Sequence, residues 1–286
     1  MKMYNWFLRN YLNDDPEKSI SSFGIKNRRC IYPLVKHLAG PLSGVNGVLV
    51  KKADMPDGPK IFAVTHTNNA EDIAWGLSFA GESSYLFCNG YNEIMYTFDG
   101  IALWLSGLIY VDRYSSESRK ASIKKAKQVL DYGGNIMIFP EGVWNMSENL
   151  LVRKLYHGVY QIALSNNIPI VPIATMIYGK TLYAIRGETI YISEYDKTSG
   201  LTLLRDSFAS MKWELMEQYG KTTREDLLKG QTPYEYWDSF INEYISTQKL
   251  YNHEQEKKDH YLDSDDKEYI DVCKTMEYLK QKYSLF

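Results

Sequence analysis

Residues 61–66 read IFAVTH and residues 135–142 read NIMIFPEG, so two short apolar runs each end in polar side chains that can carry chemistry. Both runs are continuous and rich in β-forming residues, which is typical of strands that are buried on both faces of a sheet. In open α/β sheets, ligands bind beyond the carboxyl ends of parallel strands. The two runs therefore predict that His66 and Glu141 converge on one edge of a sheet, although they lie far apart in the sequence.

Strand-like and helix-like segments alternate from about residue 47 to residue 220. This alternation predicts an α/β fold with a mainly parallel central sheet flanked by helices. We expect strands at 48–50, 61–65, 85–88, 108–111, 135–139 and 170–174, further β structure within 182–194, and helices at about 70–79, 117–132 and 154–165 and from 201 onward. Ser115 and Ser116 are N-cap candidates for the helix that the pair Gly133-Gly134 ends.

The chain has 286 residues, of which 44% are hydrophobic, and this is enough apolar material for a sizeable core. We expect one catalytic domain with extensions rather than several domains, and we place this α/β domain at residues 47–220. An amphipathic helical segment that is suited to a membrane interface precedes it at residues 1–46. A helical C-terminal extension follows at residues 221–286, with a polar linker at 252–266 before a last helix at about 267–283.

Charge is unevenly distributed along the chain. The formal net charge is only −2, so no global field points to nucleic acid, but residues 1–52 hold nine basic residues against three acidic ones. Residues 3–12 and 30–39 mix aromatic and aliphatic side chains with Lys, Arg and His. Two interpretations remain open for them: helices that lie in a membrane interface, or helices that cover the core and expose basic faces to water.

Cellular location is predicted from the cysteines and from the apolar runs. Cys30, Cys88 and Cys273 are odd in number and widely spaced, which favours a reducing cytoplasm over a disulfide framework or a structural zinc site. The N-terminus lacks the pattern of a secretory signal. The longest apolar run, at about 102–111, is half of the roughly 20 residues that a membrane span needs. We therefore expect a cytoplasmic protein without a membrane span, and the interfacial interpretation of the N-terminal helices would place it on the inner face of the membrane.

The residues after the first run favour acid–base chemistry. An imidazole accepts a proton near neutral pH, and a carboxylate against its far nitrogen fixes the tautomer and stabilises the imidazolium. His66 is followed by Glu71 and Asp72, and either carboxylate can fold back onto the ring. After the second run, Glu141 is followed by Gly142, which allows a tight turn. Taken separately, each motif is also compatible with an ordinary loop or turn.

Taken together, four blocks resemble the glycerolipid acyltransferase family, which includes the lysophosphatidate and glycerol-phosphate acyltransferases. The family pattern is a histidine and an aspartate separated by four residues, then G-x-x-(F/Y)-(I/V)-D-R, F-P-E-G-T-R-S and a V-P-(I/V) strand. The corresponding segments here are His66–Glu71, Gly107–Arg113, Phe139–Asn145 and Ile170–Ile173. The resemblance covers about residues 60–178.

The resemblance implies direct transfer of a fatty acyl group to a hydroxyl of a lysophospholipid, such as 1-acyl-glycerol-3-phosphate, or of a related lipid. His66 is the implied general base, with Glu71 or Asp72 as its partner. Arg113, Glu141 and Gly142 are implied to hold the acceptor. Acyl-CoA or acyl-carrier protein is the implied co-substrate, and no other cofactor and no metal is expected.

Three departures from the family pattern bear on this assignment. Glu71 stands at the aspartate position, and its extra methylene changes where the carboxylate meets the imidazole. The usual T-R-S is Val143-Trp144-Asn145, so Trp144 and Asn145 join the predicted acceptor site and an uncharged acceptor becomes an option. The usual lysine pair before a glycine is Tyr156-His157, ahead of Gly158.

Two other readings belong to different classes of protein. The first is a catalytically weak or inactive relative that binds lipid without turning it over. The second is a hydrolase or metal enzyme that uses His66, Glu71, Asp72 and His157. The chain has no G-x-S-x-G, H-E-x-x-H, G-x-G-x-x-G or G-x-x-x-x-G-K-[ST] pattern, so hydrolase, metalloprotease, dinucleotide and P-loop functions lack their usual sequence support.

Overall fold

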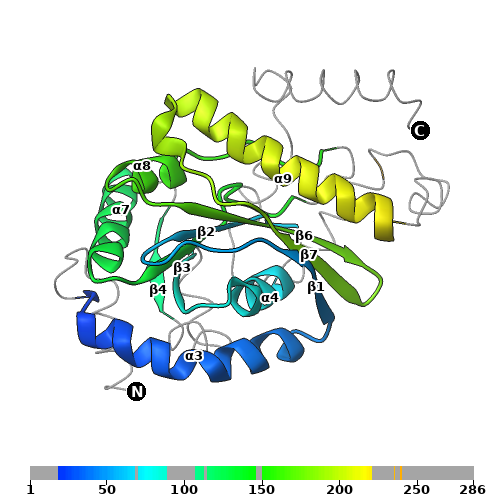
Figure 1. The fold of residues 1–286 in the computed structure, drawn as a ribbon, viewed down its shortest axis with the longest axis horizontal. Coiled ribbons are helices and arrows are strands. Elements are labelled where there is room, and N and C mark those ends of the chain that lie inside the picture. The colour runs from blue at the N-terminus through cyan, green and yellow to red at the C-terminus, as the bar shows by residue number, and fades with distance from the viewer. Residues whose placement is uncertain are drawn as a thin grey trace.

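The structure is a computed structural model that describes residues 19–67, 70–88, 107–112, 115–145 and 150–220, together with positions 235 and 239. Its centre is a seven-stranded sheet in the order β1-β7-β6-β2-β5-β3-β4 (Figure 1). The strands are β1 (Asn46–Lys52), β2 (Ile61–Val64), β3 (Ser84–Cys88), β4 (Leu108–Tyr110), β5 (Asn135–Ile138), β6 (Ile170–Tyr178) and β7 (Thr181–Arg186).

Every neighbouring pair of strands is parallel except β6 and β7, which are antiparallel. The predicted α/β class with a mainly parallel sheet is therefore confirmed. β2 lies between β6 and β5, with Ile61 opposite Ile170 on one side and Ile136 on the other. Because β2 and β5 are parallel neighbours, their carboxyl ends meet at the same edge of the sheet.

Helices cover both faces of the sheet (Figure 1). One face carries α4 (Ala70–Ala80), with α3 (Ser22–Leu42) outside it, and the other carries α7 (Ser116–Asp131), α8 (Gly158–Leu164) and α9 (Lys197–Tyr219). Ile61 and Ala63 belong to the core under α7, α8 and α9, whereas Phe62 and Val64 belong to the core under α4. All four residues are fully buried, which explains why the run reads as continuously apolar.

Three boundaries differ from the sequence-based expectation. α8 begins at Gly158 rather than near 154, and the preceding segment is instead held to the loop after β5 by a hydrogen bond from the Tyr156 N–H to the Pro140 carbonyl (2.8 Å). β6 continues to Tyr178, where it pairs with β7. α9 begins at Lys197 because the Asp196 side chain accepts hydrogen bonds from the N–H groups of Thr198 and Ser199, an N-cap that the sequence analysis missed.

Some of the remaining predictions fall on described residues and others do not. Ser115 is the N-cap of α7, and its hydroxyl accepts a hydrogen bond from the Ser118 N–H. The expected helical segment at 30–39 lies within α3. The segment 3–12, the linker at 252–266 and the helix at 267–283 lie outside the described residues, and the proposed domain boundaries stay predictions. None of the helices in the described part of the chain is long and apolar enough to cross a membrane.

Trp75 joins α4 to both α3 and β1 through two glycines. Its indole N–H donates to the Val45 carbonyl (3.2 Å), and its ring stacks on Phe79 with 5.1 Å between centroids. A Cβ at Gly40 would come within 2.6 Å of the indole, and one at Gly47 within 2.2 Å. The indole therefore fills the space that side chains at these positions would need.

We predict that Gly47→Ala lowers the free energy of unfolding by about 1–3 kcal/mol, because the added methyl overpacks the indole. Urea denaturation measures the change. Gly158→Ala is the matched control, since a Cβ there has no heavy atom within 4 Å. Equal stabilities of the two variants would contradict this account of the Trp75 contact.

Candidate active site

His66 lies two residues beyond β2, and hydrogen bonds to β6 hold the chain that leads to it. The Thr65 N–H donates to the Ile173 carbonyl (3.0 Å), and the Thr65 hydroxyl accepts from the Thr175 N–H (2.9 Å). His66 is 9% exposed. The extended strand thus brings the imidazole to the carboxyl edge of the sheet, as predicted.

Asp72 contacts the imidazole directly. Its Oδ2 lies 2.9 Å from Nδ1 of His66 and also accepts a hydrogen bond from the Thr67 N–H (2.8 Å). Asp72 is fully buried in the first turn of α4, where the positive end of the helix dipole favours a carboxylate. A carboxylate at Nδ1 selects the tautomer with the proton on that nitrogen, so Nε2 keeps its lone pair and can accept a proton.

Glu71 occupies the position of the family's aspartate, but the geometry places Asp72 on the ring. Glu71 also lies in the first turn of α4. Its Oε2 is buried and has no hydrogen-bond partner among the described residues. Of the two carboxylates that the sequence left open, Asp72 is therefore the one positioned to orient the imidazole.

Glu141 lies behind the histidine and bridges two backbone segments. Its Oε1 accepts a hydrogen bond from the His66 N–H (3.0 Å), and its Oε2 accepts one from the Arg153 N–H (2.8 Å). The residue is 1% exposed. The acceptor-binding role that the resemblance implied for Glu141 has no support in this geometry, which instead makes the carboxylate a clamp between the ends of β2 and β5 and the loop before α8.

Lys212 of α9 supplies a positive charge to this buried region. Burial raises the pKa of the Glu141 carboxyl, whereas the charge of Lys212 and the hydrogen bonds from Arg153 and His66 act in the opposite direction. Burial lowers the pKa of the Lys212 ammonium, and Glu141 and Asp72 oppose that shift. Lys212 is 2% exposed, so the acidic residues beneath the histidine have a cation buried with them.

The other predicted site residues surround the ring in different ways. Gly142 has φ +71°, a conformation that favours glycine, and its N–H donates to the Phe139 carbonyl (3.0 Å). The ring centroids of Trp144 and His66 are 5.6 Å apart in an edge-on arrangement. Asn145 is buried, with its N–H bonded to the His66 carbonyl and its Nδ2 donating to Leu150. Arg113 lies outside the described residues.

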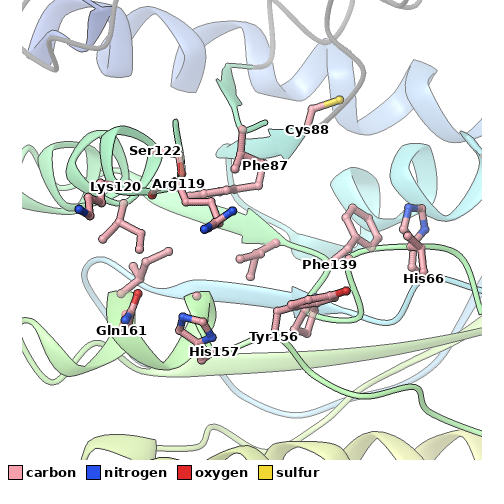
Figure 2. Close-up of a pocket in the computed structure, with 18 of the residues that line it drawn as sticks. His66, Phe87, Cys88, Arg119, Lys120, Ser122, Phe139, Tyr156, His157 and Gln161 are labelled. Carbon is pink, nitrogen blue, oxygen red and sulfur yellow. Dashed lines mark hydrogen bonds between the residues drawn. The ribbon is translucent and has the colours of Figure 1, made fainter. Parts of the chain in front are cut away.

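A cavity of about 590 Å³ opens beside the imidazole, between α7 and α8 (Figure 2). Phe139 packs against His66 in a tilted arrangement with 4.3 Å between ring centroids, and Gly142 and Trp144 also line the space. Most lining side chains are apolar, and these come from α4, β3, β5, α7, α8 and adjoining loops: Ile73, Phe87, Cys88, Val111, Ile123, Ile138, Phe139, Pro140, Val143 and Ile162. The site can thus hold an apolar chain next to a base.

Sequence analysis missed three charged residues of this region. Lys212 lies on a helix far from the motifs, and no local pattern distinguishes it from a solvated lysine. Arg119 and Lys120 of α7 line the cavity, and their spacing from Ser116 and Ile123 would have placed them on one helical face. Within the described part of the chain, no group of three or more His, Cys, Asp or Glu side chains is arranged to hold a metal ion.

Comparison with known proteins shows which family this chain resembles. The family model described as Acyltransferase matches residues 48–176. Human 1-acyl-sn-glycerol-3-phosphate acyltransferase alpha is 31% identical over 80 residues, which cover 28% of this chain and 28% of that protein. The 1-acyl-sn-glycerol-3-phosphate acyltransferase of Borreliella burgdorferi is 25% identical over 183 residues, covering 58% of this chain and 71% of that protein.

A solved structure is similar as well: the crystal structure of the 1-acyl-sn-glycerophosphate acyltransferase from Thermotoga maritima is 13% identical, with a TM-score of 0.46, and the match covers 78% of this chain and 90% of that one. The Acyltransferase match includes the segment that carries the four sequence blocks, and with these relatives it supports the predicted resemblance to the glycerolipid acyltransferase family. The match spans less than a third of the length of the human relative.

The clamp formed by Glu141 generates a prediction about stability. We expect Glu141→Gln to lower the free energy of unfolding by about 1–3 kcal/mol. The amide retains one acceptor oxygen but faces the second backbone N–H with a donor, and the charge that accompanies Lys212 is lost. Urea denaturation measures the effect. Glu71→Gln is the control and should change stability little; unfolding of Glu141→Gln at the wild-type urea concentration would refute the clamp.

Proposed function

We propose that this protein is an O-acyltransferase that moves a fatty acyl group from acyl-CoA or acyl-carrier protein to a hydroxyl of a lysophospholipid, such as 1-acyl-glycerol-3-phosphate. The observation that carries the proposal is the hydrogen bond between His66 Nδ1 and buried Asp72 at the mouth of a mostly apolar cavity. The names of the human and Borreliella relatives supply the acceptor class.

In the proposed reaction, Nε2 of His66 removes the proton from the acceptor hydroxyl as its oxygen attacks the thioester carbonyl carbon. The tetrahedral intermediate then collapses, the carbon–sulfur bond breaks, and the departing thiolate takes the proton from the imidazolium. Asp72 stabilises the imidazolium between the two steps. An ester and a free thiol are the products, and no acyl-enzyme forms.

The surroundings of His66 suit this chemistry for physical reasons. The cavity walls exclude bulk water from an apolar chain, which favours transfer to a bound hydroxyl over hydrolysis. Trp144 stands where the family has a cationic residue, so a phosphate on the acceptor needs its contact elsewhere. We assign Trp144 and Gly142, which both line the cavity, to acceptor packing, and Asn145 to support of the His66 loop.

A membrane surface is the proposed source of the lipid acceptor, and we place the protein peripherally on the inner face of the membrane. α3 exposes Leu34, Leu38 and Leu42 at a spacing of four residues, with 46–68% of each side chain accessible. Phe23, eleven residues before Leu34, shares this stripe and is also exposed. Basic residues on the same helix would face anionic headgroups.

We predict that His66→Ala and Asp72→Asn each lower kcat by about 10²–10⁴-fold, the usual magnitude of general-base catalysis. Glu71→Gln should retain activity within about tenfold, because its carboxylate does not contact the imidazole. The measurement is acylated product from labelled acyl-CoA or acyl-carrier protein and 1-acyl-glycerol-3-phosphate, with circular dichroism to verify folding.

Two results would contradict this assignment. Near-wild-type turnover of folded His66→Ala would remove the histidine from the mechanism, and a greater loss in Glu71→Gln than in Asp72→Asn would exchange the partners. Wild-type protein that binds lipid but forms no acylated product with either donor would favour the lipid-binding alternative instead.

The exposed stripe of α3 generates a separate prediction. The double variant Leu34→Glu/Leu38→Glu should bind anionic phospholipid vesicles at least about tenfold more weakly, because charge replaces two apolar contacts with the bilayer. Vesicle co-sedimentation measures the binding. Leu164→Glu on α8 is the matched control, since that side chain is 51% exposed on another part of the molecule. Equal binding of all three proteins would rule out α3 as the docking helix.

A further inference from the structure

The cavity has a basic end that the proposed acid–base chemistry does not use. Arg119 and Lys120 of α7 lie along its upper side, opposite His157 and Gln161 of α8, and His66 stands at the other end beyond Phe139 (Figure 2). We call Arg119, Lys120, His157 and Gln161 the basic rim. All four side chains are exposed to solvent, so a ligand can reach them without any change in the fold.

Charge makes the basic rim selective for an anion. No Asp or Glu is among the described residues that line the cavity, whereas Arg119 and Lys120 both are. The planar guanidinium donates to two oxygens of a phosphate at once, and a nearby ammonium adds a second positive charge.

Along the cavity, His66 is followed by the apolar ring of Phe139 and then by the basic rim, an order that matches an elongated amphiphile. The reacting end of such a molecule would lie at His66, an apolar or weakly polar middle would run past Phe139, and an anionic group would reach the basic rim. The donor has this design, because its phosphopantetheine arm separates the thioester from a phosphate. The lysophospholipid also carries a phosphate, but on the glycerol carbon next to its reacting hydroxyl.

We propose that the basic rim, with Arg119 and Lys120 as its charged contacts, binds a phosphate ester of a substrate while the reacting group lies at His66. This inference rests on the proposed function and deepens it. It also supplies a cationic contact in a chain that has Trp144 in place of the arginine of the third family block. The rim is a binding site and takes no part in bond breaking.

Equilibrium binding tests the rim independently of catalysis. The probes are CoA and 1-acyl-glycerol-3-phosphate, and each has a counterpart without phosphate, pantetheine and monoacylglycerol. We expect Arg119→Ala/Lys120→Ala to weaken binding of at least one phosphorylated probe about tenfold or more, with a smaller salt dependence, and to leave both counterparts unchanged. Calorimetric titration of the wild-type and variant proteins measures these affinities.

Controls separate a local contact from a change in overall charge. Lys124→Ala removes one positive charge from an exposed position of the same helix that does not line the cavity, so it should bind every probe as the wild type does. Arg119→Lys keeps the charge but loses the bidentate fork, and we expect intermediate affinity. Thermal melting verifies that the exposed substitutions leave the fold intact.

The pattern of losses identifies the ligand. Weaker binding of CoA assigns the rim to the donor, and weaker binding of 1-acyl-glycerol-3-phosphate assigns it to the acceptor. Unchanged affinity for both phosphorylated probes, or an equal loss for pantetheine or monoacylglycerol, would overturn the proposal. Because binding is measured without turnover, an inactive enzyme with an intact phosphate site would contradict the proposed function and not the rim.

Discussion

The bridge that Glu141 makes between the His66 N–H and the Arg153 N–H is the contact on which the site depends. β2 and β5 are parallel neighbours, and this places the two loops side by side but does not fix how either chain continues beyond the sheet. One buried carboxylate accepts a hydrogen bond from each segment and so fixes them relative to each other. A carboxylate can do this because both of its oxygens accept hydrogen bonds, whereas one end of an amide is a donor. Glu141 thus fixes the backbone on which the site is built, and it is not among the residues that line the cavity.

Burying this charge has an electrostatic consequence. Glu141 and Asp72 are both almost completely inaccessible, and buried carboxylates need hydrogen bonds or a compensating charge. Lys212 reaches this region from α9, which packs on β6. The long C-terminal helix therefore contributes charge as well as apolar packing, and it connects the end of the described chain to the chemistry at the sheet edge. Sequence motifs alone would have left α9 outside the site.

Sequence reasoning predicted the features that depend on local pattern and failed where the tertiary arrangement decides. Continuous apolar runs predicted β2 and β5 and their common edge, because burial on both faces leaves no position for a polar residue. The serine cap of α7 was equally readable. The predicted start of α8, near residue 154, was too early. Before Gly158 the chain is held by tertiary hydrogen bonds, from the Arg153 N–H to Glu141 and from the Tyr156 N–H to Pro140. Lys212 was missed because no local pattern marks a buried lysine before the helices are placed. The helical face shared by Arg119 and Lys120 was readable from their spacing, but the cavity that this face lines was not. Arg113, part of the predicted site, lies outside the described residues.

The carboxylate that contacts His66 lies one residue further along the chain than in the family pattern. The family pattern separates histidine and aspartate by four residues, whereas Asp72 is separated from His66 by five. Successive residues of a helix differ by about 100° around its axis, so an additional residue before α4 moves the position facing the imidazole from 71 to 72. An aspartate there has the short side chain that the family uses, and the distance of 2.9 Å to Nδ1 is that of an ordinary hydrogen bond. Glu71 is one position away from the one that meets the ring, and its buried Oε2 has no hydrogen-bond partner among the described residues. The combination favours a loop that has been lengthened while the geometry of the imidazole and its carboxylate has been kept.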